Sequence, residues 1–184
     1  MNEIKLIIFF ILTVGIILFS WRSLKDRQSH GFYRIFAFEL ILLLILLNID
    51  YWFANPFSIP QIISWILLIT SIVVVADGFY LIKKIGRPVG KVEDSSNLGF
   101  ENTSNLVTIG IYRFIRHPLY ASLLFLSWGA FLKNLTVPDS VIIILISVFL
   151  TLTAEKEEEE NKVHFGDEYS VYMTKTKMFI PFIF

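Results

Sequence analysis

Long apolar stretches separated by short polar segments dominate the pattern of this 184-residue chain. The apolar stretches cover residues 4–21, 32–53, 59–82, 119–132 and 137–153. Each of the first three is long enough to cross a hydrocarbon core of about 30 Å as a helix, because a helix rises about 1.5 Å per residue. The last two are shorter and flank a segment containing Asn134 and Pro138, which predicts a tight turn between two helices.

The pattern therefore predicts an all-α integral membrane protein with about five transmembrane helices, of which the last two form a short helical hairpin. This hairpin could cross a locally thinned bilayer, or it could pack against the other helices without crossing the bilayer. The first stretch is comparable in length to a signal peptide, but its leading residues include Glu3 and Lys5, and no small-residue cleavage site follows it. We expect a retained membrane anchor.

The distribution of basic residues predicts the orientation of these helices. Of the 16 Lys and Arg, all but Lys5 and Lys133 fall within residues 22–34, 83–116 and 156–177. Positive charge is enriched on the cytoplasmic side of membrane proteins. Five alternating spans then place the N-terminus outside and the C-terminus in the cytoplasm.

Composition narrows the possible functions. Hydrophobic residues make up 55% of the chain, which is too apolar for an ordinary soluble domain. The formal net charge is zero, so a nucleic-acid partner is not expected. The chain has no cysteine, which excludes disulfides, thiolate metal sites and a cysteine nucleophile, and we expect no metal site.

The segment "RFIRHPLYASLL" gathers cationic and titratable residues at the start of an apolar helix. Pro118 suits the first helical position, which places His117 at the cap with Arg113 and Arg116 just before it. Exposed N–H groups at a helix start attract a carboxylate or phosphate, and Tyr120 adds a hydroxyl in the first turn. Alternatively, the arginines only reach toward lipid headgroups while His117 caps the helix.

A run of acidic residues, "EKEEEE" at residues 155–160, lies on the same predicted side of the membrane. Such a run usually forms a solvated face. Facing the basic helix start, it would instead form a polar site with both signs of charge, suited to a zwitterionic or cationic small molecule.

Together, "LVTIGIYRFIRHPLY" (residues 106–120) and "EEEENKVHFGDEYSVY" (residues 157–172) resemble the isoprenylcysteine carboxyl methyltransferases and the related phospholipid methyltransferases. The shared pattern is Gly-x-Tyr, Arg-His-Pro-x-Tyr, a helical hairpin, a glutamate pair, Phe-Gly and a tyrosine-rich tail. The resemblance starts near Asn97. It implies an N-terminal three-helix membrane region at residues 1–96 and a cytoplasmic cofactor-binding region at residues 97–184.

The resemblance implies an integral-membrane methyltransferase that uses S-adenosylmethionine without a Rossmann domain, and the chain has no Gly-x-Gly-x-x-Gly loop. Its cofactor-binding residues are expected to be Ser104, Asn105, Leu106, Val107, Tyr112, His117, Pro118, Leu119, Tyr120 and Glu157. Catalytic roles are expected for His117, Arg116 and Tyr120. The acceptor would be a lipophilic small molecule or lipid that enters from the bilayer, and the active site would face the cytoplasm.

One departure from the family pattern concerns the acceptor. The carboxyl methyltransferases place an arginine four residues before the glutamate, where it would hold the substrate carboxylate, and this chain has Thr153 there. Asn161 also replaces a leucine that usually follows the glutamate pair. The acceptor could therefore be a prenylcysteine carboxylate or, as the alternative, a phospholipid amine.

Glu39 and Asp77 fall within predicted spans on the cytoplasmic side, whereas Asp50 lies near the outer end of the second span and is expected at the interface. Carboxylates inside a membrane are costly and tend to line cavities or to pair with cations. They could pair with Arg34, Lys83 or Lys84, or they could join Thr153 in binding the substrate.

Two other functions stay open on the sequence alone. A sterol-type reductase has a loosely similar C-terminal region, but NADPH calls for basic residues where this chain has residues 155–160. A non-catalytic membrane protein that has kept the cofactor pocket is the other. Binding of S-adenosylmethionine and a methylated product separate these possibilities.

Overall fold

The computed structural model of the protein describes residues 2–89 and 102–184, and the regular structure of this part of the chain is entirely helical. Its α-helices are α1 (Glu3–Phe19), α2 (Trp21–Lys25), α3 (His30–Asn48), α4 (Ile59–Leu81), α5 (Pro118–Phe131), α6 (Val137–Phe165) and α7 (Asp167–Lys175). Shorter segments are η1 (Ile49–Tyr51), η3 (Gly110–Arg113) and the π-helix η2 (Ile82–Gly86). The all-α prediction is confirmed. The predicted boundary between residues 96 and 97 lies outside the described residues.

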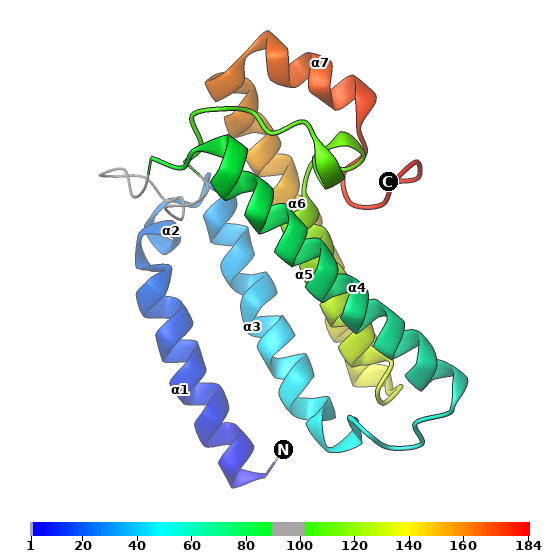
Figure 1. Ribbon diagram of the computed structural model, residues 1–184. Helices are drawn as coiled ribbons and strands as arrows, with labels where there is room; N and C mark the ends of the chain where they lie inside the picture. Colours follow the sequence, from blue (N-terminus) through cyan, green and yellow to red (C-terminus); the bar gives the residue numbers. More distant parts are fainter. Residues whose placement is uncertain (1, 90–101) are drawn as a thin grey trace.

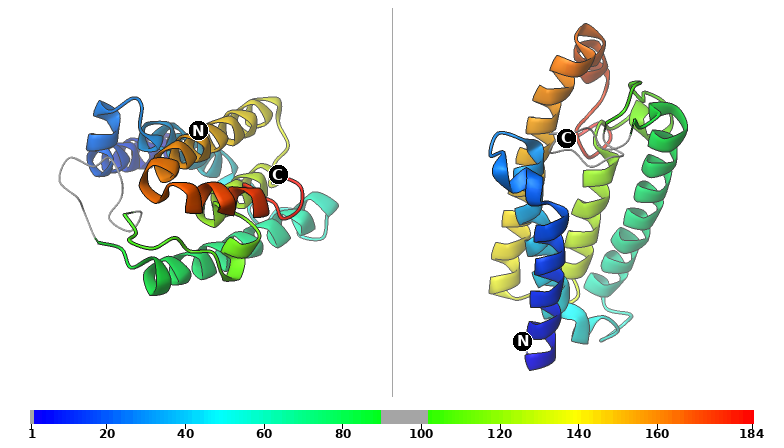
Figure 2. Two further views of the ribbon diagram at one scale, coloured as in Figure 1. Left: turned by 90° about the horizontal axis from the view of Figure 1, so that it is seen from above. Right: turned by 90° about the vertical axis from the view of Figure 1, so that its left-hand side faces the viewer.

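The long helices lie side by side, and the chain reverses direction from each to the next (Figure 1). Helix α3 packs mainly on α6 and α4 mainly on α5, while α1 lies at the edge against α3. The N-terminus is at one end of the bundle, and α2 and α7 are at the other (Figures 1 and 2). The basic segments 22–34 and 156–177 therefore share an end with the described part of residues 83–116.

Three helical segments of the described chain are long and apolar enough to cross a membrane: His30–Tyr51, Ile59–Gly86 and Val137–Phe165. The protein is thus built for membrane insertion. Helices α1 and α5 are shorter, with 17 and 14 residues. Five spans and the orientation of the termini stay predictions.

Helix α6 is longer than the sequence predicted. The expected short hairpin ended at residue 153, but α6 continues through the glutamate run to Phe165 and has 29 residues. Glu and Lys are good helix formers, and the run contains no Gly or Pro to end the helix. Helix α6 ends at Gly166, whose φ of 60° suits glycine and turns the chain into α7.

Small residues let α4 and α5 approach closely. Ser64 Oγ donates to the carbonyl of Gly129, and Ser71 Oγ to that of Ser122, each over 2.7 Å. A Cβ on Gly129 would lie 2.9 Å from Leu68 Cδ2. Small side chains and hydroxyl-to-backbone bonds are typical of helix contacts in membranes. These contacts hold α4 and α5 together along their length.

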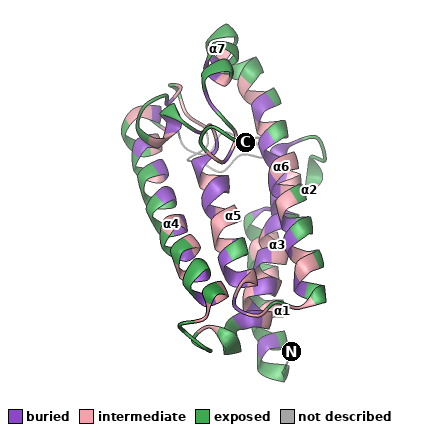
Figure 3. Ribbon diagram, turned by 90° about the vertical axis from the view of Figure 1, so that its right-hand side faces the viewer, coloured by how far each residue is buried: buried purple, intermediate pink, exposed green. Residues whose placement is uncertain are grey.

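The buried core lies between α3, α5 and α6. Much of α4 is exposed (Figure 3), and many of the exposed residues on α1 and α4 are apolar. Exposed members on α4 include Ile62, Ile63, Ile66, Ile69, Ile72 and Val73. An outward apolar surface of this kind suits contact with lipid, where burial of apolar groups needs no protein partner.

Candidate active site

A cavity of about 310 Å³ lies at the α7 end of the bundle, where α5 begins. The predicted site residues that line it are Leu106, Val107, Tyr112, residues 116–120 and Glu157. Helices α3 and α4 also contribute side chains. The predicted regions 1–96 and 97–184 therefore form one cavity together.

The C-terminal segment holds the basic motif in place. Pro118 occupies the first helical position of α5 and His117 its N-cap, as the sequence predicted. The backbone N–H of Arg116 donates to the carbonyl of Lys177 over 2.8 Å, and that of His117 to Met178 over 3.2 Å. This pairing of distant segments fixes the direction in which residues 116 and 117 point.

A buried carboxylate joins two of the three predicted catalytic residues, Arg116 and His117. Arg116 Nε donates to Glu158 Oε1 over 2.6 Å, and His117 Nε2 lies 3.2 Å from the same oxygen. The side chains of Arg116 and Glu158 are only 10% and 8% exposed. Arg116 Nη1 also donates to the carbonyl of Thr176 over 2.5 Å. Arg116 therefore lines the cavity and also binds α6 to the C-terminal segment.

The glutamate run does not form a uniformly solvated face. Glu157 lines the cavity, with Oε1 3.9 Å from His117 Nδ1. Glu158 holds Arg116, and Glu160 accepts a hydrogen bond from the backbone N–H of His30 on α3 over 3.0 Å. Glu155 and Glu159 are the exposed members, and Glu159 bonds to its neighbour Lys156. The contacts of Glu157 and Glu158 with His117 and Arg116 agree with the interpretation that the run forms part of a site with both positive and negative charges.

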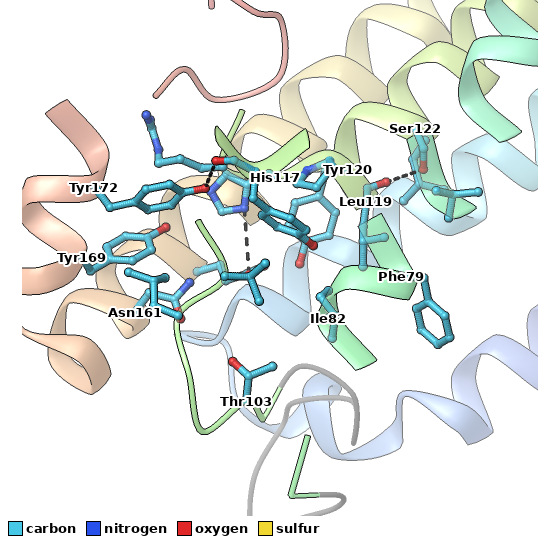
Figure 4. Close-up of a pocket in the computed structure, with 18 of the residues that line it drawn as sticks. Phe79, Ile82, Thr103, His117, Leu119, Tyr120, Ser122, Asn161, Tyr169 and Tyr172 are labelled. Atoms are coloured by element: carbon cyan, nitrogen blue, oxygen red, sulfur yellow. Dashed lines mark hydrogen bonds and ion pairs between the residues drawn. The ribbon is translucent and has the colours of Figure 1, made fainter. Parts of the chain in front are cut away.

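Tyrosines of α7 close the polar side of the cavity (Figure 4). Tyr172 donates its hydroxyl to the carbonyl of Tyr112 over 2.6 Å, which ties α7 to η3. Burial raises the pKa of Tyr169, of Tyr172 and of Tyr112. Their hydroxyls therefore stay protonated at neutral pH and act as hydrogen-bond donors.

The opposite wall of the cavity is apolar. Val75, Phe79 and Ile82 come from α4 and the π-helix that follows it, at spacings that place them on one helix face. Leu119 (Figure 4) and Leu123 come from α5. The cavity thus combines charged and hydroxyl groups with a hydrocarbon-like wall, so it suits an amphipathic ligand or a polar and an apolar ligand together.

Two predicted cofactor residues do not line the cavity. Ser104 and Asn105 are exposed, and their backbone N–H groups both donate to the carbonyl of Gly86. The Asn105 amide also donates to the carbonyl of Ile85 over 3.1 Å. They fasten the loop that carries Leu106 and Val107 to the end of the π-helix.

The three predicted substrate residues also lie off the cavity wall. Thr153 is fully buried, and its hydroxyl donates to the carbonyl of Phe149 in the preceding turn. Glu39 accepts a 2.7 Å hydrogen bond from Thr13 of α1, and not from the cations expected as partners. Asp77 is exposed on α4.

Several residues that line the cavity were not predicted from the sequence, among them Arg34, Phe38, Asn161 and Phe165. Asn161 and Phe165 follow Glu157 at intervals of four, so they share its face of α6. Extending the predicted helix through the glutamate run would have found them. Arg34 and Phe38 share a face of α3, but nothing in their local sequence indicates which neighbour that face meets.

A family model described as phospholipid methyltransferase matches residues 59–168, which is more than half of the chain. The helical membrane architecture and the cavity at the Arg-His-Pro motif already define a membrane protein with a site for an amphipathic ligand. The chain belongs to the phospholipid methyltransferase family. A search of curated proteins finds no match to the chain.

Proposed function

We propose that this protein is an S-adenosylmethionine-dependent methyltransferase whose acceptor is a lipophilic molecule held in the membrane. One observation carries the proposal: His117 and Glu157, far apart in the sequence, line one cavity that also has an apolar wall. Membership of the family supports methyl transfer as the reaction.

The residues of the cavity fit S-adenosylmethionine. The first-turn N–H group of Leu119 has no acceptor within its own helix, and it suits the methionyl carboxylate. Glu157 can accept hydrogen bonds from the amino group or the ribose hydroxyls. Val107 and Leu119 offer apolar surface for the adenine. When bound, the cofactor supplies an electrophilic methyl group.

The protein's own contribution to such a transfer is positioning and exclusion of water. The ring of His117 stacks on that of Tyr120, with centroids 5.7 Å apart, and its Nε2 is fixed by Glu158. An amine acceptor must lose a proton, and His117 Nδ1 or Glu157 is the group that would take it. Arg116 has the role of keeping Glu158 and His117 in place.

The acceptor's apolar part would lie along Val75, Phe79 and Leu123, between α4 and α5. Since Thr153, Glu39 and Asp77 lie elsewhere, we assign acceptor binding to this wall instead. Both a phospholipid amine and a prenylcysteine carboxylate fit a cavity with an apolar wall and a polar end. The two acceptors are therefore tested side by side.

We further propose that the α7 end of the bundle faces the cytoplasm, with five membrane-embedded segments and an external N-terminus. The three basic segments at that end support this orientation. Reporter fusions after Lys84 and after Phe184 should both read as cytoplasmic. Opposite locations for these two fusions would rule out the proposed topology.

The function is tested with purified protein in detergent. Isothermal titration calorimetry should detect binding of S-adenosylmethionine and no binding of NADPH. Protein in nanodiscs is then incubated with methyl-labelled cofactor and either phosphatidylethanolamine or N-acetyl-S-farnesylcysteine, and the products are identified by mass spectrometry. Labelled product from either acceptor supports the proposal, whereas cofactor binding without any product indicates a non-catalytic protein. Absence of cofactor binding rules it out.

A further inference from the structure

The segment that follows α7 returns to the bundle and runs beside the start of α5 (Figure 1). The backbone N–H of Lys177 donates to the carbonyl of Phe114 over 3.0 Å. Residues 180–184 then close a turn, in which the N–H of Phe184 donates to the carbonyl of Ile180 over 3.1 Å. These bonds hold the segment at the level where the apolar helix α5 begins, which is the level expected for lipid headgroups.

Large apolar side chains of this segment are exposed. Phe182 is 82% exposed and Ile183 75%, and Phe114 of the neighbouring loop is 44% exposed. The rings of Phe114 and Phe182 face each other edge to face, with centroids 6.1 Å apart. The backbone of Phe182 has a φ of +67°, a region that bulky residues rarely adopt. Neighbouring exposed apolar side chains of this size mark a surface that contacts a membrane or a partner.

Basic residues supply the side-chain charge of the same region. The charged side chains of residues 109–115 and 173–184 are Arg113, Lys175 and Lys177, and all three are exposed. None of the three forms an ion pair with another residue of the described chain. Cations beside exposed aromatic and aliphatic side chains are typical of segments that lie in the interface of a bilayer and contact anionic lipids.

We propose that one surface docks on the bilayer beside α5 and binds the phosphate groups of anionic lipids. This C-terminal surface consists of Arg113, Phe114, Lys175, Lys177, Phe182 and Ile183. Its apolar side chains lie among the headgroups, and its cations contact the phosphates. The occupant is the bilayer and not a second protein, because the surface lies at the headgroup level of the helices that the bilayer surrounds.

The lipid bound by the C-terminal surface is a component of the surrounding membrane and not the methyl acceptor. None of the six residues of the surface lines the cavity. The inference therefore does not depend on the proposed reaction, and its test measures no activity.

The position of the surface is tested with single fluorescent labels. The chain has no cysteine, so Ile183→Cys and, as the control, Val163→Cys each carry one nitrobenzoxadiazole label. Val163 is 89% exposed and lies on the charged last part of α6. Each labelled protein is placed in nanodiscs of phosphatidylcholine, with or without phosphatidylglycerol, that contain a lipid with a nitroxide near its headgroup. Phosphatidylglycerol supplies the anionic phosphate without an amine to methylate. With this lipid present, the label at position 183 should be quenched about twofold or more strongly than the label at position 163.

Two sets of substitutions separate this surface from the overall charge of the protein. The test set is Arg113→Gln with Lys175→Gln and Lys177→Gln, and the control set is Arg22→Gln with Lys25→Gln and Arg27→Gln, at exposed positions in and after α2. Each set removes three positive charges from the same end of the bundle (Figure 1). The test set should abolish the extra quenching that phosphatidylglycerol causes at position 183, and the control set should keep it. Melting temperatures show that the variants are folded, and the comparison of the two labels in the parent chain does not depend on them.

Three results would overturn the inference. The first is a label at position 183 that is quenched no more strongly than the label at position 163. The second is quenching that does not increase with phosphatidylglycerol, or an increase that survives in the test set. The third is blue-shifted emission at position 183 without quenching by the nitroxide, which would show that a second copy of the chain covers the surface.

Discussion

Arg116 Nε and Glu158 Oε1 lie 2.6 Å apart, although the residues are 42 positions apart in the chain. The pair joins the start of α5 to α6, and the same carboxylate oxygen lies 3.2 Å from His117 Nε2. The Arg-His-Pro motif and the glutamate run are thus parts of one structure. A function that needs both segments depends on this contact.

Replacing Glu158 should strongly destabilise the protein. Glu158→Ala leaves the buried Arg116 without its carboxylate, and breaking a buried pair costs about 3–5 kcal/mol. Denaturation in detergent micelles measures the loss. Glu159→Ala is the matched control, because the Glu159 side chain is 64% exposed, and it should change the free energy of unfolding by less than about 0.5 kcal/mol. Equal effects of the two substitutions would show that the Arg116 pair contributes nothing.

Replacing Glu157 should affect the cofactor and not the fold. Glu157 lines the cavity and its side chain is 25% exposed. Glu157→Gln should weaken binding of S-adenosylmethionine by about 1–3 kcal/mol, roughly 5- to 150-fold, since it removes a charge-assisted hydrogen bond. Calorimetry measures the affinity, and the melting temperature without cofactor should stay unchanged. Parent-like affinity would remove Glu157 from the proposed cofactor site.

Gly110 should not tolerate a side chain. Its φ is +60°, and an added Cβ would lie 2.5 Å from Leu81 Cδ1. Gly110→Ala should lower the free energy of unfolding by about 1–2 kcal/mol for the left-handed backbone alone, and it should displace Tyr112 and weaken cofactor binding. Gly15→Ala, with nothing within 4 Å of the added Cβ, should have no such effect. Matching melting curves for the two variants would contradict this prediction.

Thr153→Arg, which introduces the arginine of the carboxyl methyltransferases, should not improve methylation of a prenylcysteine. Thr153 is fully buried and does not line the cavity, so Thr153→Arg would force a guanidinium into packed helices at a cost of several kcal/mol. We expect a lower melting temperature and no gain in methylation of N-acetyl-S-farnesylcysteine. Thr153→Val, of similar size, should stay near the parent in stability. Faster methylation by Thr153→Arg would show that this position does reach the substrate.

Much of the fold follows from the sequence, because the hydrophobic effect acts on local patterns. The run of apolar residues from Ile59 to Leu81 forms α4 as predicted, and Pro118 starts α5 since its fixed φ suits the first helical turn. The continuation of α6 to Phe165 was not predicted, because the charged run was interpreted as the end of a span although Glu and Lys favour a helix. The family was also predictable from the order of the Arg-His-Pro motif, the hairpin and the glutamate pair. The same order predicted that His117 and Glu157 lie side by side.

Only the tertiary structure decided how each segment is used. Thr153 and Glu157 stand one turn apart on α6, yet one is packed away and the other lines the cavity, because neighbouring helices cover different parts of its surface. The packing of α3 against α6 brings Glu160 to His30, one turn from Arg34 on the cavity wall. Such long-range contacts depend on how whole helix faces fit together, and the sequence near any one residue does not contain that information.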